Sequence, residues 1–346
     1  MKKFVILSEG YLANPHHGKT TRGIVNYGKD EVVAILDSTF ESDEFQGIPV
    51  VASISGALEY GPSVAIVGVA TTGGRLPAEF REQVVGAIEA GLDVEAGMHQ
   101  FLGDDDELTA LAATHGVELR DLRRSPDDLS VPTGANLEHD AEVVLTVGSD
   151  CAIGKMTIAL ELHQQAVRAG YASVFVPTGQ TGIAIAGWGI AVDAVIADYI
   201  AGAGERLVVE GARRGDLLWI EGQGSLIHPL YSGVTLGLYH GAMPHQLVLC
   251  HRAGERHIVN QPDHPIPPLT ELIEIYERAS LPARSAKVTA IALNTSLLDD
   301  AAARAAIAKA EADTGLVAGD PVRFGSERLT AAVTQAIGTR QASTSA

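Results

Sequence analysis

The residues best suited to chemistry lie in a glycine-rich turn at the centre of the chain. Gly148 and Gly154 enclose five residues, and Lys155 follows directly. An apolar run at residues 143–147 precedes this turn, and residues 158–167 follow it with the pattern of a helix. Strand, glycine turn with lysine, and helix together are the parts of a phosphate-binding loop. Its backbone N–H groups and the helix N-terminus attract an anion, and the lysine adds a full positive charge.

This loop departs from the usual pattern at Met156. In loops that cleave a nucleoside triphosphate, a hydroxyl residue at this place coordinates Mg²⁺ beside the phosphates. Here Thr157 follows one position later, about a quarter-turn further round the helix. We therefore expect the loop to bind phosphate, with Mg²⁺ possible but not essential. The expected phosphate contacts are Gly148, Ser149, Asp150, Cys151, Ala152, Ile153, Gly154, Lys155, Met156 and Thr157.

Two polar loops follow later apolar strands. The first, at residues 177–182, has side-chain donors between two glycines, and the second follows the apolar run at 216–220 and begins with Glu221. Phosphate-loop proteins place a metal ligand or a water-positioning acid where Glu221 stands. The other polar side chains of these loops are candidates for holding a ligand: Thr178, Gln180, Thr181, Gln223 and Ser225.

Four histidines gather in the second half of the chain: His228, His240, His245 and His251. Their spacing fits no common zinc pattern, so we predict no metal site. A neutral imidazole suits a general base, which makes His228 a candidate beside Glu221. Asn294, at the end of an apolar run, is assigned to ligand binding only by analogy with other phosphate-loop proteins. In the N-terminal part, Lys19, Arg22 and Arg75 follow strands and are able to bind an anion.

Length and composition limit the fold and the partners. Apolar residues make up 46% of the 346, enough for two cores, and a net charge of −18 disfavours nucleic acid and anionic membranes. Two cysteines indicate no disulfide framework, which fits a reducing cytoplasm. We expect a small-molecule substrate and a symmetric homo-oligomer. Strands that alternate with helices predict an α/β chain with a Rossmann-like parallel-sheet domain at 1–130, a P-loop NTPase-like parallel-sheet domain at 131–340 and a flexible tail at 341–346.

Taken together, these motifs resemble the DUF1611 family over about residues 3 to 337. The resemblance rests on the glycine turn and on the sequences at 91–102, 177–182, 221–229 and 292–296. The family's C-terminal domain is similar to dethiobiotin synthetase, whose loop also has five residues between its glycines. Family members of known activity are D-glutamate N-acetyltransferases, which use acetyl-CoA. The resemblance therefore implies the same activity here, in D-amino acid catabolism, with the glycine turn as the seat of the CoA phosphates.

The residues agree with this expectation, because CoA phosphates need to be held and not cleaved. We expect Glu221 or His228 to take a proton from the substrate ammonium. The N–H groups of residues 222–224, or the Gln180 side chain, would stabilise the thioester oxyanion. Lys19, Arg22 and Arg75 would bind the two carboxylates of glutamate. Two alternatives stay open: a ligase of the dethiobiotin synthetase kind that uses Mg²⁺ and ATP, and a nucleotide-binding module without catalysis.

Overall fold

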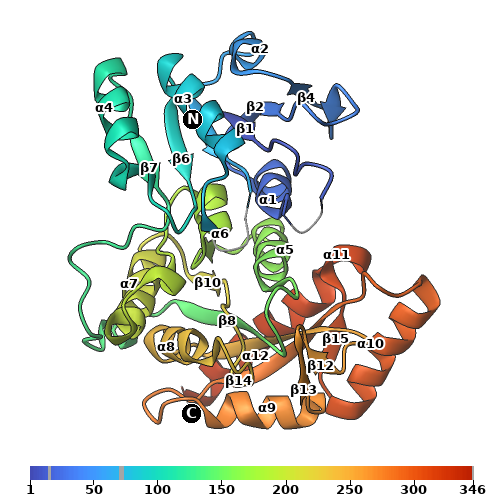
Figure 1. The fold of residues 1–346 in the computed structure, drawn as a ribbon. Helices are drawn as coiled ribbons and strands as arrows, with labels where there is room; N and C mark the ends of the chain where they lie inside the picture. The colour runs from blue at the N-terminus through green and yellow to red at the C-terminus, as the bar shows by residue number, and fades with distance from the viewer. Residues whose placement is uncertain (15–16, 70–73, 345–346) are drawn as a thin grey trace. The chain divides into compact units, whose positions relative to one another are not determined.

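The computed structural model describes residues 1–14, 17–69 and 74–344, with the backbone alone from 338 onward. Its contacts divide the chain into two units (Figure 1). The first comprises Met1–Ser125 and Gly179–Ala194, and the second comprises Pro126–Thr178 and Val195–Ala346. The chain thus passes into the second unit five residues before the predicted boundary. Residues 179–194, which we assigned to the second domain from their place in the sequence, pack with the first unit.

The first unit is a Rossmann-like α/β domain, as predicted. Its strand order is β3-β4-β2-β1-β5-β6-β7, and all neighbours are parallel except β3 and β4. The strands are β1 (Lys3–Leu7), β2 (Glu31–Leu36), β3 (Glu44–Phe45), β4 (Ile48–Val51), β5 (Val64–Val67), β6 (Asp93–Ala96) and β7 (Leu119–Asp121). The α-helices are α1 (Lys19–Tyr27), α2 (Ile54–Leu58), α3 (Ala78–Glu89), α4 (Asp106–His115) and α6 (Gln180–Ala186).

The helix α6 joins the first unit through α1. Thr181 Oγ1 and Thr20 Oγ1 share a buried hydrogen bond of 2.9 Å, and the Lys29 amide donates to the Ile185 carbonyl at 3.2 Å. The seven-residue helix ends at Gly187, whose left-handed φ of 73° is the usual helix C-terminal conformation. A segment between two strands of the second unit is therefore part of the packing of the first.

The second unit contains the P-loop sheet, and all six of its strands are parallel, in the order β15-β14-β11-β8-β10-β9. The strands are β8 (Glu142–Gly148), β9 (Ser173–Val176), β10 (Leu217–Ile220), β11 (Gln246–Arg252), β14 (Lys287–Asn294) and β15 (Val317–Gly319). A separate antiparallel hairpin pairs β12 (His257–Ile258) with β13 (Gln261–Pro265). The α-helices are α5 (Lys155–Arg168), α7 (Ile200–Ala212), α8 (Ser232–Ala242), α9 (Leu269–Arg278), α10 (Asp300–Thr314), α11 (Pro321–Phe324) and α12 (Glu327–Thr344).

The order of strands in this sheet reverses around β8. From β8 the chain crosses through α5 to β9 at one edge, and all later crossovers run in the opposite direction. Because such crossovers are right-handed, α5 lies on one face of the sheet and α7 to α10 lie on the other. Ligands of open α/β sheets bind at the carboxyl ends of strands where the order reverses. The candidate loop follows β8 at this place.

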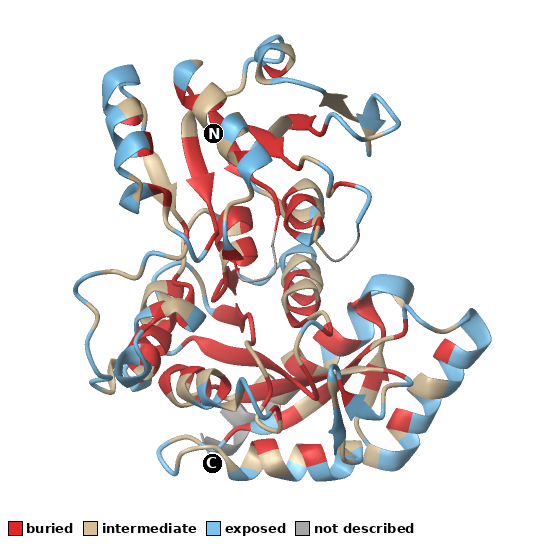
Figure 2. Cartoon of the chain, viewed as in Figure 1, coloured by how far each residue is buried: buried red, intermediate tan, exposed pale blue. Residues whose placement is uncertain are grey.

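The central strands β8 and β10 are apolar because they are buried. All seven residues of β8 and all four of β10 are buried, as expected for parallel strands covered on both faces (Figure 2). By contrast, only Ala303 and Ala310 of α10 are buried.

The α12 helix runs to Thr344, so residues 341–344, expected as a flexible tail, are helical here. Within the described residues, no helix is long and apolar enough to span a membrane.

Candidate functional site

The glycine turn has the backbone that a phosphate-binding loop requires. It starts where β8 ends at Gly148 and leads into α5 at Lys155. Gly154 has φ 107°, a region that side chains disfavour, and even Ala152 is left-handed at φ 52°. A Cβ atom on Gly148 would lie 2.6 Å from Ile153 Cδ1. The predicted glycines are therefore both needed, one for its conformation and one for close packing.

Most amides of this loop have no hydrogen-bond partner among the described residues. The Ser149 amide donates to the Cys250 carbonyl at 3.0 Å, and the Cys151 amide donates to Asp150 Oδ1 at 2.6 Å. The N–H groups of residues 152–157 make no such bond within residues 1–14, 17–69 and 74–344. They comprise the end of the loop and the first turn of α5, where the helix dipole favours an anion.

Lys155 is the first residue of α5, and its side chain is buried. The residue is 6% exposed, and its ammonium donates to the Asp150 carbonyl at 2.6 Å. An ammonium has three donors, so Lys155 is able to donate further hydrogen bonds besides this one. Burial lowers the pKa of Lys155, while the nearby acidic groups, including Cys151 and Asp150, act in the opposite direction. A bound phosphate would stabilise the charged lysine further, which suits the predicted role.

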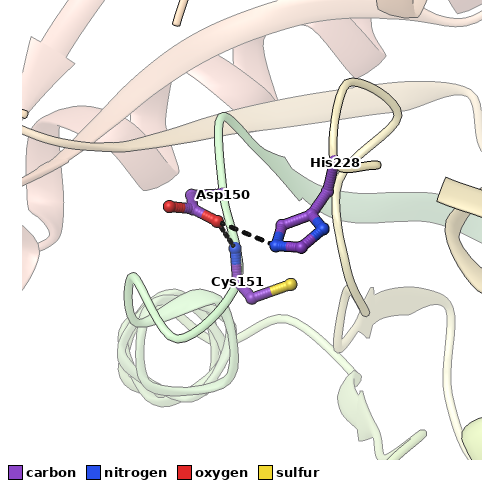
Figure 3. Close-up of side chains that lie close together, drawn as sticks. All are labelled: Asp150, Cys151 and His228. Atoms are coloured by element: carbon purple, nitrogen blue, oxygen red, sulfur yellow. Dashed lines mark hydrogen bonds and ion pairs between the residues drawn. The ribbon is translucent and has the colours of Figure 1, made fainter. Parts of the chain in front are cut away.

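The Asp150 carboxylate brings a negative charge into the same loop. Asp150 is 1% exposed; its Oδ1 accepts the Cys151 amide, and its Oδ2 accepts the Val259 amide at 2.8 Å. His228 Nε2 lies 3.6 Å from Oδ1, too far for a hydrogen bond. Figure 3 shows the imidazole and the Cys151 thiol close to this carboxylate. Two amide donors hold the Asp150 side chain in place.

Asp150, Cys151 and His228 also have the residue types of a metal site. One ligand atom from each lies within 4.8 Å of the others (Figure 3), a combination that an argument from histidine spacing alone overlooks. A histidine that binds a metal through Nε2 carries its proton on Nδ1 and donates it to an acceptor. Here Nδ1 instead accepts the Leu230 amide at 3.1 Å. This hydrogen bond to Nδ1 does not fit a metal on Nε2, and the absence of a metal site stays a prediction.

Glu221 follows β10 directly and lies beside the loop. It is 5% exposed, and its Oε2 accepts the Thr178 amide at 3.0 Å. Thr178 Oγ1 in turn donates to the Glu221 carbonyl at 2.6 Å and accepts from Gln223 Nε2 at 3.0 Å. A Cβ atom on Gly222 would approach the Lys155 side chain to 3.2 Å, which brings this loop next to the lysine. The structure thus brings Thr178, Glu221 and Gln223 together.

Among the expected oxyanion donors at residues 222–224, the Gly222 amide needs a correction, and the other two stay a prediction. The Gly222 amide donates to Thr146 Oγ1 at 2.9 Å, so it is already used within the protein. Gly222 also packs so closely on β8 that a Cβ atom would lie 1.7 Å from the Thr146 carbonyl oxygen. Gly224 has φ 57° and turns the chain toward Ser225, which is fully buried. The Gly222 N–H therefore serves the turn and not a ligand.

Comparison with known proteins places both units in one family. Residues 130–330 match the family described as "Domain of unknown function (DUF1611_C) P-loop domain", and residues 37–125 match its Rossmann-like "DUF1611_N" domain. The chain belongs to the DUF1611 family. A crystal structure of a DUF1611 family protein from Anabaena variabilis is similar over 97% of this chain and 100% of that one, with 40% identity and a TM-score of 0.89.

Two curated relatives of this DUF1611 chain are named D-glutamate N-acetyltransferase. The one from Tritonibacter scottomollicae is 38% identical over 78% of this chain and 80% of its own length. The other, from a Pseudoalteromonas species, is 34% identical over 81% of this chain and 83% of its own length. The resemblance predicted from the motifs is thereby confirmed, as are the Rossmann-like and P-loop domains.

Several residues elsewhere in the DUF1611 P-loop unit form hydrogen bonds with the loop. Asn294 Nδ2 donates to the Ile153 carbonyl at 3.1 Å, and Arg252 donates to the Ala152 carbonyl at 2.6 Å. Ser149 Oγ lies 2.9 Å from His251 Nδ1. Met156 and Thr157 are half-buried in the first turn of α5. The Asn294 side chain thus positions a loop carbonyl, and its assignment as a ligand contact stays a prediction.

The remaining substrate candidates belong to the first unit. Gln180 Oε1 accepts from Arg123 Nε at 2.9 Å, and Thr181 bonds with Thr20. Arg22 donates to the Leu12 carbonyl at 3.0 Å and stacks on Phe45 at 5.0 Å, so it contributes to packing. Lys19 and Arg75 are exposed. For all five candidates, a contact with substrate stays a prediction: Gln180, Thr181, Lys19, Arg22 and Arg75.

Sequence reasoning missed Tyr276, which is fully buried in α9. Its hydroxyl donates to the Gly148 carbonyl at 2.7 Å and accepts the Leu226 amide at 3.1 Å. It also lies 3.4 Å from Ser225 Oγ. One aromatic residue at helical spacing is the ordinary mark of a core position, so the sequence held no signal for this role.

Proposed function

We propose that this chain transfers the acetyl group of acetyl-CoA to the amino group of D-glutamate. The observation that carries the proposal is the row of unbonded amides at residues 152–157 next to the buried Lys155. CoA carries a pyrophosphate, which such a loop can hold. We take the acetyl group and the acceptor, D-glutamate, from the names of the two curated relatives.

The chemistry of the step assigns three tasks to the protein. The amino nitrogen attacks the thioester carbonyl after its ammonium loses a proton, and a buried carboxylate such as Glu221 can accept that proton. Negative charge then develops on the carbonyl oxygen and needs a hydrogen-bond donor. Collapse of the intermediate breaks the carbon–sulfur bond and releases CoA, whose sulfur takes up a proton. The nitrogen gives up its second proton as the amide forms, and the leaving sulfur takes one up, so the transfer balances without water and without a covalent enzyme intermediate.

Cys151 does not need to carry the acetyl group in this scheme. Burial raises the pKa of its thiol, with Asp150 adding to the effect and Lys155 opposing it. A thiol with a raised pKa has little thiolate at neutral pH, and the thiolate is the nucleophilic form. We therefore propose direct transfer. We expect initial-rate kinetics that indicate a ternary complex of the enzyme with both substrates.

The experiment is a thiol-release assay with acetyl-CoA and a panel of D- and L-amino acids, with and without Mg²⁺. Release of CoA only when D-glutamate is present supports the proposal. A parallel assay for ADP with ATP and Mg²⁺ tests a ligase of the dethiobiotin synthetase kind. Saturable binding of CoA or ATP without turnover of any pair would instead indicate a nucleotide-binding module.

A further inference from the structure

His228 combines deep burial with a ring nitrogen that makes no hydrogen bond within the part of the chain that the structure describes. It lies between β10 and α8, and its side chain is 5% exposed. Its ring packs against Tyr231, with 4.8 Å between the ring centroids. Nε2 lies 3.6 Å from Asp150 Oδ1, beyond hydrogen-bond distance. A buried polar atom without a hydrogen bond costs free energy, so Nε2 is a candidate ligand contact.

The hydrogen bond at Nδ1 determines which nitrogen carries the proton. The Leu230 amide lies 3.1 Å from His228 Nδ1, and an amide N–H can only donate. Nδ1 therefore presents its lone pair, and in the neutral ring the proton lies on Nε2. Burial lowers the pKa of His228, and Asp150 opposes this effect. Lys155 and His264 lower the pKa further. At neutral pH the ring is therefore uncharged and donates through Nε2.

That N–H group lies beside the glycine turn, near a second donor. The Lys155 ammonium donates to the Asp150 carbonyl at 2.6 Å, and His228 Nε2 lies close to the carboxylate of the same residue (Figure 3). Two backbone amides already hold this carboxylate on the loop. Donors from two different segments of the chain therefore meet at Asp150, next to the amides of residues 152–157, which make no hydrogen bond among the described residues.

We infer that His228 binds a phosphate oxygen of the ligand through Nε2–H, as a phosphate contact and not as the base of the reaction. This inference rests on the proposed function, in which the ligand is acetyl-CoA and the glycine turn holds its pyrophosphate. Phosphate oxygens are charged acceptors and form strong hydrogen bonds. The loop has no hydroxyl at Met156, where other phosphate-binding loops have one. A donor from outside the loop therefore adds a contact that the loop lacks, and Glu221 is left as the candidate base.

Two amide substitutions distinguish this role from a purely structural one. His228→Gln places an N–H₂ group near the position of Nε2 but removes the acceptor of the Leu230 amide. His228→Asn keeps an oxygen near the position of Nδ1 and has no atom near Nε2. A structural role at Nδ1 predicts the larger loss in His228→Gln, whereas a phosphate contact at Nε2 predicts the larger loss in His228→Asn. The order of the two variants therefore decides between the two roles.

The measurement is a calorimetric titration of wild type and variants with CoA and with inorganic pyrophosphate. We expect the Kd for both ligands to rise by about 10- to 150-fold in His228→Asn, the loss of one hydrogen bond to a charged group. In His228→Gln it should stay close to the wild-type value. His115→Asn at the exposed end of α4 is the control. Circular dichroism and thermal unfolding show whether each variant is folded.

Kinetics with a donor that lacks phosphate give a second readout. For acetyl-CoA, we expect His228→Asn to raise KM and to change kcat little. For S-acetylpantetheine, which carries the thioester but no phosphate, kcat/KM should be the same in His228→Asn and wild type. Equal losses with both donors, or a larger loss of affinity in His228→Gln than in His228→Asn, would overturn the inference.

The binding arm also separates this inference from the proposed function. Wild-type protein that binds CoA and pyrophosphate but transfers no acetyl group would remove the proposed function, and the comparison of His228→Asn with His228→Gln would still test the phosphate contact. Wild-type protein that binds neither ligand would overturn the inference as well.

Discussion

The Tyr276 hydroxyl lies 2.7 Å from the carbonyl oxygen of Gly148, the first residue of the phosphate-binding loop. The same hydroxyl accepts the amide of Leu226, three residues after Gln223. One buried side chain of α9 therefore joins the loop after β8 to the loop after β10. The relative position of the phosphate site and Glu221 depends on these two hydrogen bonds.

Tyr276→Phe should disturb the phosphate-binding loop, while the aromatic ring keeps its packing in the core. Loss of the hydroxyl leaves the Gly148 carbonyl and the Leu226 amide without this partner, at a cost of about 1–3 kcal/mol in the free energy of unfolding. We also expect a higher KM for acetyl-CoA, because the loop loses a fixed end.

Tyr239→Phe is the matched control, because Tyr239 is equally buried and its hydroxyl donates to the Tyr276 carbonyl at 2.9 Å, away from the loop. Urea unfolding and initial rates of both variants distinguish an effect on the loop from an effect on stability alone. A KM for acetyl-CoA that stays at the wild-type value in Tyr276→Phe would show that this hydroxyl only stabilises the fold.

Lys155→Ala should weaken donor binding. A hydrogen bond to a charged group contributes about 1.5–3 kcal/mol, so we expect KM for acetyl-CoA to rise by about 10- to 150-fold. The control is Lys309→Ala on α10, where the lysine pairs with Asp313 on the surface. Titration of CoA by calorimetry gives the same comparison without turnover. Equal affinity of wild type and Lys155→Ala would contradict the placement of the phosphates.

Gly222→Ala should destabilise the second unit. Its Cβ would lie 1.7 Å from the Thr146 carbonyl oxygen, so the turn after β10 must move away from β8. We expect a loss of at least about 2 kcal/mol, in the range of overpacked buried sites. Gly233→Ala in α8 meets no atom within 4 Å and should instead be neutral or stabilise the helix. Denaturant midpoints at one pH compare the two variants.

The free energy of unfolding should fall between neutral pH and about pH 4. Burial lowers the pKa of His245 to about 3 and that of His163 to about 4. Both histidines are neutral in the folded chain, and below pH about 6.5 the unfolded chain binds protons that the folded chain does not. Stability is therefore lost as pH drops through this window. His245→Gln should flatten the slope, whereas His115→Gln at the exposed end of α4 should not; equal slopes would refute this origin.

The parts of the site that are local in sequence were predictable. Gly148, Gly154 and Lys155 lie within one turn, and the restrictions on backbone angles act over the same few residues. Glu221 was predictable because parallel strands end at one edge of their sheet. Both domain folds followed from alternating apolar runs, although the short strands β6, β7 and β15 carried too few residues for a clear period.

The parts that depend on tertiary packing were not predictable. Nothing in residues 179–194 indicates that they pack with the first unit, because burial against α1 is a property of the folded chain. The use of the Gly222 amide by Thr146 depends on how closely two strands end, which spacing does not encode. The tautomer of His228 likewise depends on one amide, that of Leu230.

The most direct measurement follows wild-type protein with acetyl-CoA and D-glutamate and quantifies both products in the same sample. We expect equal amounts of free CoA and N-acetylated D-glutamate, formed without ATP. Absence of the acetylated amino acid while CoA binds, or turnover that yields ADP and requires ATP, would contradict it.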